Sequence, residues 1–211
     1  MRRSRPDRPA DHPNGGVLMM RSGVRPRTQS GFLMLEAMIA LFVLLIGLLG
    51  LAGLQARSQQ AENESYQRSQ ALILLQDMAD RMNANRAAAA SYVTASAVGT
   101  GNSLTDCATP PTLAESDLCQ WSAELLGAAE MSGGTCNAST GANCIGAMIS
   151  ARGCIANLGA TANGPFMIEV VWQGLSPTTA PPSSVACGSG AYGSEAMRRA
   201  VTTIVQFANL N

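Results

Sequence analysis

Residues 32–54 read FLMLEAMIALFVLLIGLLGLAGL, an apolar run with one charged residue, Glu36. A helix of about 20 apolar residues, rising about 1.5 Å per residue, spans the hydrocarbon core of a bilayer, which is about 30 Å thick. Seven arginines precede the run and none lies within it, so the positive-inside rule places the N-terminus in the cytoplasm. The sequence therefore predicts one membrane-spanning segment, with the remainder of the chain in the periplasm.

Charge is distributed unevenly along the 211 residues, although it sums to zero. Residues 1–31 carry seven arginines and two aspartates, a net charge of +5. Residues 32–211 carry seven arginines and twelve acidic residues, a net charge of −5, and the chain has no lysine. A nucleic-acid-binding domain would present a basic face, so the acidic body argues against a nucleic-acid partner.

The cysteines all lie in the second half of the chain, at Cys107, Cys119, Cys136, Cys144, Cys154 and Cys187. No two are spaced as C-x-x-C, and the single histidine, His12, lies in the basic N-terminal segment. A zinc site would require closer pairs of ligands, so disulfides in an oxidising compartment are favoured over a metal site. Six cysteines allow fifteen connectivities, of which we favour a Cys154–Cys187 bridge. We expect no metal and no cofactor.

A single helix is expected from residue 32 to about residue 86, because no proline occurs between Pro26 and Pro110. Residues 55–70 are polar on all sides, whereas the last third of the helix has an apolar stripe that should pack on a globular head. This stripe consists of Leu72, Leu75, Ala79 and Met82. The ion pairs expected four residues apart are Glu64–Arg68 and Asp77–Arg81. Gly47, Gly50 and Gly53 either permit close packing of helices or weaken the helix locally.

The remaining residues, 87–211, predict a small α+β head. Thr112 and Glu115 follow two prolines and form a capping-box signature for a short helix that ends at Gly127. Apolar residues alternate in residues 166–172 and in residues 201–207, which predicts two half-buried strands. A long loop rich in proline and glycine joins these strands. Antiparallel strands laid against the long helix and stapled by disulfides are the fold that we predict.

The junction between the basic segment and the apolar run, Ser30-Gly31-Phe32-Leu33-Met34-Leu35-Glu36, resembles the prepilin cleavage motif of type IV pilins and type II secretion pseudopilins. The resemblance implies that a prepilin peptidase removes residues 1–31 as a leader, cutting after Gly31. Phe32 then becomes an N-methylated N-terminus. The resemblance also implies that Glu36 pairs with the N-terminal amine of a neighbouring subunit. Such a pair gives a carboxylate in an apolar filament core the opposite charge that it needs.

Two further segments, IGLLGLAGLQ at residues 46–55 and DMADRMNANR at residues 77–86, resemble the PilV family of minor pilins. Membership would imply a subunit of a priming or tip complex in type IV pilus assembly, with roles in adhesion and twitching motility. The implied partners are the prepilin peptidase, the other minor pilins, the major pilin, the inner-membrane assembly platform and a tip adhesin. Met19 and Met20 are alternative starts for the leader.

The resemblance also implies an organisation and a location. The expected parts are a cleaved leader (1–31), a transmembrane half of the helix (32–54), a periplasmic half (55–86) and a globular head (87–211). The subunit would begin as a single-pass inner-membrane protein and end in the pilus at the cell surface.

Three other functional classes are compatible with parts of the sequence. A minor pseudopilin of a type II secretion system shares the leader and the helix. A signal-anchored periplasmic protein would leave the charge of Glu36 within the membrane unexplained. A DNA-binding pilin could use Arg198 and Arg199, although such a pair is more often a solvated edge.

An enzyme is not expected. Residues 32–211 have neither histidine nor lysine, which excludes Ser-His-Asp and Ser-Lys catalysis. Glu115 and Asp117 are two residues apart on the short helix, so their side chains diverge.

Overall fold

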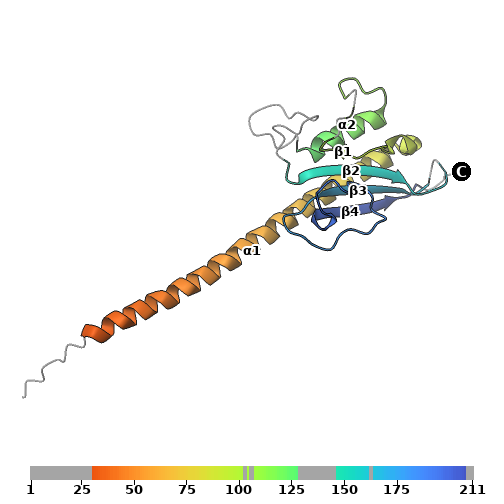
Figure 1. Ribbon diagram of the computed structural model, residues 1–211. Coiled ribbons are helices and arrows are strands. Elements are labelled where there is room, and N and C mark those ends of the chain that lie inside the picture. The colour runs from red at the N-terminus through yellow and green to blue at the C-terminus, as the bar shows by residue number, and fades with distance from the viewer. Residues whose placement is uncertain (1–29, 102–103, 105–106, 128–145, 162–163, 208–211) are drawn as a thin grey trace, which may run out of the picture. The chain divides into compact units, whose positions relative to one another are not determined.

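The computed structural model describes residues 30–101, 104, 107–127, 146–161 and 164–207 (Figure 1). The chain divides into two compact units, residues 1–50 and 51–211. The elements follow in the order α1 (Ser30–Ala84), η1 (Arg86–Tyr92), β1 (Val98–Gly99), α2 (Leu113–Leu125), β2 (Ile149–Asn157), β3 (Phe166–Gln173), η2 (Glu195–Met197) and β4 (Arg198–Val205). A long N-terminal helix, a four-stranded antiparallel sheet and two disulfides make up the α+β fold that the sequence predicts.

Helix α1 covers 55 residues, and each of its ends lies within two residues of the predicted one. Its first half is dominated by leucine, alanine and methionine, which have high helix propensity, and proline is absent. After Ala84 the Asn85 N–H still donates to the Arg81 carbonyl at 3.0 Å, and the 3₁₀ helix η1 begins at the next residue. Ala88, with φ −110° and ψ 23°, interrupts the helical geometry.

In the second unit α1 buries one stripe, formed by Ala71, Leu75, Met78, Ala79 and Met82. The prediction that Leu72 begins this stripe is wrong, since its side chain is 47% exposed. Consecutive helical residues are about 100° apart, so one can face the core while the next does not, although Met78 and Ala79 are both buried. Ala71 faces it, and its small side chain leaves room for the neighbouring elements.

The sheet has the strand order β1-β2-β3-β4, and every neighbouring pair is antiparallel. The predicted strand is confirmed, and Phe166, Ile168 and Val170 are fully buried in the main core. The prediction that it is half-buried is wrong, because Glu169 and Val171 on the opposite face are buried too, under the loop that follows the strand. Strand β4 begins at Arg198, three residues before the predicted start, and ends at Val205. The two-residue strand β1 is too short to produce a periodic pattern.

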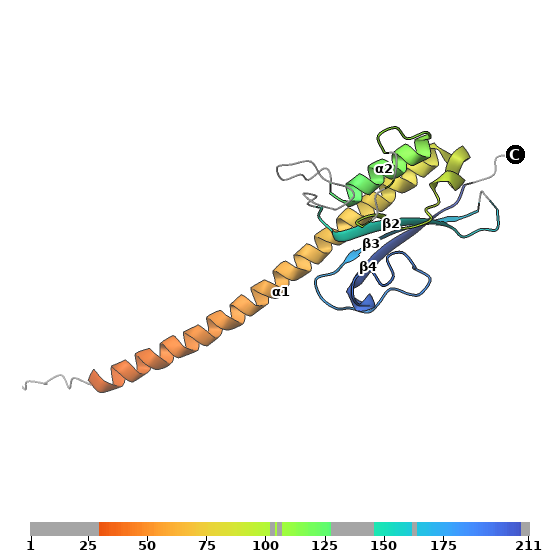
Figure 2. The same ribbon diagram turned by 45° about the horizontal axis from the view of Figure 1, so that its top comes forward.

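Helix α2 begins as the capping box predicts, with the Thr112 hydroxyl oxygen accepting the Glu115 N–H at 3.2 Å. Figures 1 and 2 show α2 beside the C-terminal part of α1, on one face of the sheet. Trp121 is fully buried there and its indole N–H donates to the Leu74 carbonyl at 3.0 Å. A Cβ at Gly153 of β2 would lie 2.3 Å from the Trp121 ring, so this position requires glycine.

The loop between β3 and β4 covers part of the opposite face of the sheet. Val185, Cys187 and Tyr192 of this loop form a second buried cluster with Val171 of β3. The Tyr192 hydroxyl donates to the Ser150 carbonyl at 3.0 Å, which ties the loop to β2.

Candidate functional site

The N-terminal part of α1 is the most unusual surface of the described chain. Every side chain from Phe32 to Gln59 is exposed, including the large apolar residues of the run. Within the described ranges α1 is the helix that is long and apolar enough to cross a membrane, and its most apolar segment is not buried at all. Soluble monomers rarely expose apolar patches of this size, so this surface requires a lipid or protein environment.

The residues that the cleavage motif singles out lie in the first two turns of α1. The helix begins at Ser30, so Gly31 is helical, and the Phe32 side chain is 73% exposed. Glu36 is exposed too, and among the described residues it has no hydrogen-bond or ion-pair partner. This arrangement leaves the carboxylate available to a group from outside the chain. Cleavage, methylation and subunit pairing at these residues stay predictions.

A charged junction joins α1 to α2 inside the second unit. The Arg81 guanidinium contacts Asp77 at 2.7 Å, as predicted, and Glu124 of α2 at 2.9 Å. It also donates to the Gln120 side-chain oxygen at 2.6 Å. Burial opposes the charge of Arg81, but the hydrogen bond to Asp77 and the surrounding carboxylates outweigh it and raise the pKa of the guanidinium.

Tyr92 of η1 extends this junction. Its hydroxyl donates to the Asp117 carboxylate and accepts from the Asn85 side-chain amide at 3.2 Å. Burial, followed by the hydrogen bond to Asp117, raises the pKa of Tyr92 to about 12. Glu115 caps its own helix through Thr112, so Glu115 and Asp117 serve different partners, as their spacing predicts.

The two arginines that begin β4 are not a solvated edge, so that expectation is wrong. Arg198 is 3% exposed and donates to the carbonyls of Val185 and Cys187 at 2.8 and 3.0 Å. Its guanidinium also pairs with Glu195 at 2.6 Å. Sequence patterns do not reveal this burial, because the partners come from the loop that precedes the strand.

Arg199 makes the long-range contact that the sequence does not predict. Its guanidinium pairs with Glu64 of α1 at 3.3 Å, so Glu64 contacts β4 rather than the expected Arg68. The Arg199 side chain is 15% exposed. Both arginines are thus engaged with carboxylates of the chain itself, which counts against a DNA-binding role for them.

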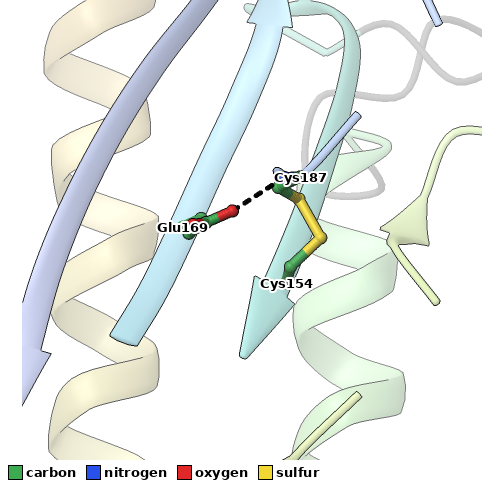
Figure 3. Close-up of side chains that lie close together, drawn as sticks. All are labelled: Cys154, Glu169 and Cys187. Atoms are coloured by element: carbon green, nitrogen blue, oxygen red, sulfur yellow. Dashed lines mark hydrogen bonds between the residues drawn. A yellow bond between two sulfur atoms is a disulfide. The ribbon is translucent and has the colours of Figure 1, made fainter. Parts of the chain in front are cut away.

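Figure 3 shows the disulfide between Cys154 and Cys187, which the sequence analysis favoured, next to Glu169. Glu169 is 3% exposed, and its carboxylate accepts the Cys187 N–H at 2.9 Å. Burial raises the pKa of Glu169, against the opposing effects of the Cys187 N–H and the Arg198 charge.

The ligand atoms of Cys154, Glu169 and Cys187 lie within 4.8 Å of one another, the spacing of a metal-binding set. The two sulfur atoms are bonded to each other, however, and a disulfide offers no thiolate to a metal ion. With the disulfide formed, the cluster has a structural role, because it links the β3–β4 loop covalently to β2. A second bridge joins Cys107 to Cys119, and Cys136 and Cys144 lie outside the described residues.

Comparison with protein families adds the deciding observation. Residues 53–124 match a family model described as Tt1218-like, type IV pilin Tt1218. The long N-terminal helix, the small antiparallel sheet and the disulfides of the described residues are consistent with a type IV pilin fold. The matched segment runs from the apolar part of α1 to Glu124 of α2 and includes the Arg81 junction. The searches of curated proteins and of solved structures gave no match. The family match, over residues 53–124, supports a type IV pilin.

Proposed function

We propose that this chain is a minor pilin of the PilV kind, cut between Gly31 and Phe32 and assembled into a type IV pilus through the N-terminal half of α1. The observation that carries the proposal is the exposed apolar run of α1, residues 32–54, in which Glu36 is the single charged residue. A neighbouring subunit can cover the apolar side chains and supply a positive charge to the carboxylate. The family match at residues 53–124 supports the coarser part of the proposal, a type IV pilin.

The proposed subunit begins as a single-pass protein of the inner membrane. Residues 1–31, with a net charge of +5, stay in the cytoplasm, and the head enters the periplasm. The two disulfides support this orientation, because they persist in an oxidising compartment. The partners are the prepilin peptidase, the other pilins, the assembly platform and a tip adhesin.

The role is structural rather than enzymatic. The buried or partly buried charged groups of the second unit serve as partners to one another, as at Arg81 and Arg198. The Arg81–Glu124 pair fastens α1 to α2, and the Arg198–Glu195 pair fastens β4 to the turn before it.

The first test is the N-terminus of the protein in native membranes, determined by intact mass and N-terminal sequencing. We expect a mature chain that begins with N-methyl-Phe32. A strain without the prepilin peptidase is the control and should give the uncut chain. An uncut chain in both strains would contradict the proposal and leave a signal-anchored protein.

The second test separates the pilus from a type II secretion system. We expect the mature chain in filaments sheared from the cell surface. Retention in the membrane, together with a loss of secreted enzymes when the gene is deleted, would instead indicate a pseudopilin.

A further inference from the structure

The outer edge of strand β4 has free hydrogen-bonding groups. The Gly174 N–H donates to the Met197 carbonyl at 2.8 Å, and this pair continues the register in which Gln173 faces Arg198. Hydrogen-bonded pairs alternate with non-bonded pairs in an antiparallel ladder. Residues 199, 201, 203 and 205 therefore bond to β3, whereas Ala200, Thr202 and Ile204 direct their N–H and C=O groups away from it.

The chain itself fills only the start of this edge. The Ala196 carbonyl, which has the same outward direction, accepts the Thr178 N–H of the loop at 2.9 Å. Beyond that point no described residue forms a hydrogen bond with the outward backbone groups of Ala200, Thr202 or Ile204. The edge is thus open over three consecutive outward positions.

This open stretch lacks the usual protection of an edge strand. Natural edges carry charges, proline or bulges that prevent another strand from pairing. Residues 200–205 read AVTTIV, with no charge and no proline, and the register with β3 has no irregularity. Thr202 is exposed and Ile204 is 61% exposed. Such an edge is suited to a second strand.

A groove lies beside the edge, on the face to which Ala200 and Thr202 direct their side chains. It has a volume of about 290 Å³, and its lining residues are Thr179, Pro181, Pro182 and Val185 of the loop and Arg198, Arg199, Ala200 and Thr202 of β4. Ile204 lies on the same face, since side chains alternate along a strand. One end of the edge therefore offers a large apolar side chain and the other end a small residue beside a groove.

We propose that this edge pairs with the same edge of a second copy of the chain, antiparallel and centred on Thr202. Thr202 then faces Thr202 of the partner subunit, and Ala200 faces the partner subunit's Ile204 in both directions. Three facing pairs with two hydrogen bonds each satisfy all the outward groups of both strands. Each Ile204 side chain comes to lie over the groove of the other copy.

The charges near the edge permit this register. Arg198 falls opposite Gln206 of the partner subunit, and Arg199 falls opposite the partner subunit's Val205, so no arginine faces another. Both arginines are already neutralised within their own chain, by Glu195 and Glu64. The pairing requires only the edge of β4 and does not depend on the pilin function proposed above.

Single cysteines in the full-length chain, in native membranes treated with a mild oxidant, test the register. In a facing hydrogen-bonded pair the Cα atoms are about 5.5 Å apart, within disulfide reach. Thr202→Cys should give a covalent dimer. Ala200→Cys alone and Ile204→Cys alone should not give one, because in this register each cysteine is about 13 Å from the same residue of the partner subunit. Co-expression of these two variants should restore the dimer.

Two controls complete the design. Thr161→Cys places the new thiol at an exposed position away from β4 and should stay monomeric. A dimer of this variant would indicate that an added thiol exchanges with the native disulfides. Ile204→Lys in the Thr202→Cys chain should abolish the dimer, because it removes the apolar side chain that would lie over the groove and places a positive charge beside Arg198 and Arg199, which also line it. Absence of the Thr202→Cys dimer would overturn the proposal. Equal dimer from the Thr202, Ala200 and Ile204 cysteine variants, which would indicate association by other surfaces, would overturn it too.

Discussion

At the scale of single residues, the chain has fourteen arginines, one histidine and no lysine. Its buried positive charges are arginines, and their contacts depend on the shape of the guanidinium. Arg81 binds oxygens of Asp77, Gln120 and Glu124 at once, and Arg198 binds two carbonyls and Glu195. A guanidinium has five donors in a planar fork, whereas an ammonium is a point charge. These contacts allow a positive charge to be buried without losing hydrogen bonds.

Glu36 is the residue on which the assembly proposal can fail. Glu36→Gln removes the charge and keeps the size, so cleavage should persist while incorporation into filaments falls. The measurement is the amount of mature chain in sheared filaments relative to membranes. Glu62→Gln, another exposed glutamate of α1, is the matched control and should be incorporated normally. Normal incorporation of the Glu36 variant would remove the pairing role.

Glu169 should make stability depend on pH. Its pKa is raised above the ordinary 4.5 mainly by burial, so the folded state binds more protons than the unfolded state. Its contribution is therefore fully present below pH 4.5 and is lost as pH rises through the higher folded pKa. Glu169→Gln keeps the acceptor for the Cys187 N–H and should weaken this decline, as measured by thermal unfolding in detergent from pH 4 to 8. Some loss of stability with rising pH should remain in this variant, because burial also raises the pKa of Glu124.

Glu169→Ala is the contrasting variant. It removes the acceptor as well as the charge, so the buried Cys187 N–H is left without a partner, at a cost of about 1–3 kcal/mol at every pH. If the Gln and Ala variants behaved alike, the carboxylate would have no role as an acceptor.

At the scale of elements, α1 combines two requirements in one helix. Its last turns pack on the head through Ala71, Leu75 and Met78, and its first turns expose apolar residues. The glycines of the first part are not explained by contacts in the single chain, because a Cβ added at Gly47, Gly50 or Gly53 would meet nothing within 4 Å. Their reason must lie in the assembled state or in the strength of the helix itself.

Two substitutions at Gly50 separate these reasons. Alanine strengthens a helix by up to about 1 kcal/mol relative to glycine, yet adds only a methyl group. If glycine is there for close packing, Gly50→Ala should assemble almost normally and Gly50→Leu should not. If it is there to weaken the helix, Gly50→Ala alone should impair assembly while circular dichroism shows a more stable helix. Normal assembly of both variants would exclude both explanations.

The elements differ in how well the sequence predicts them. The absence of proline and the long apolar run predict α1, and alternation predicts the position of β3, because both are local signals. Alternation does not predict that the second face of β3 is buried, since a distant loop covers it. The choice of Ala71 over Leu72 as a core residue depends on the neighbours that approach the helix, so the larger apolar residue is the wrong guess. Glu195 is only three residues from Arg198, but the burial of Arg198 depends on carbonyls of the preceding loop and Arg199 pairs with Glu64 of α1, and these partners leave no local pattern. The cleavage motif at Gly31 is also a local signal, but it is recognised from the sequence and not from any contact in the structure.

At the scale of the whole molecule, the second unit has few large apolar residues and depends on covalent links. Its main core is built around Trp121, Tyr92 and Phe166, and a smaller cluster lies under the β3–β4 loop. The Cys154–Cys187 bridge fastens this loop, and the Cys107–Cys119 bridge fastens the segment before α2. The two bridges therefore constrain different parts of the chain.

The difference between the bridges leads to a quantitative prediction. A disulfide stabilises a fold largely by restricting the unfolded chain, typically by about 2–4 kcal/mol, and more for a longer loop. The sequence separations are 33 residues for Cys154–Cys187 and 12 for Cys107–Cys119, which favours the former by about 1 kcal/mol. Replacing each pair by alanines and measuring denaturant unfolding in detergent should reveal this order. Cys136 and Cys144 are unchanged in both variants, so their contribution cancels. A larger loss from the Cys107–Cys119 pair would mean that native contacts, rather than chain entropy, decide what these bridges contribute.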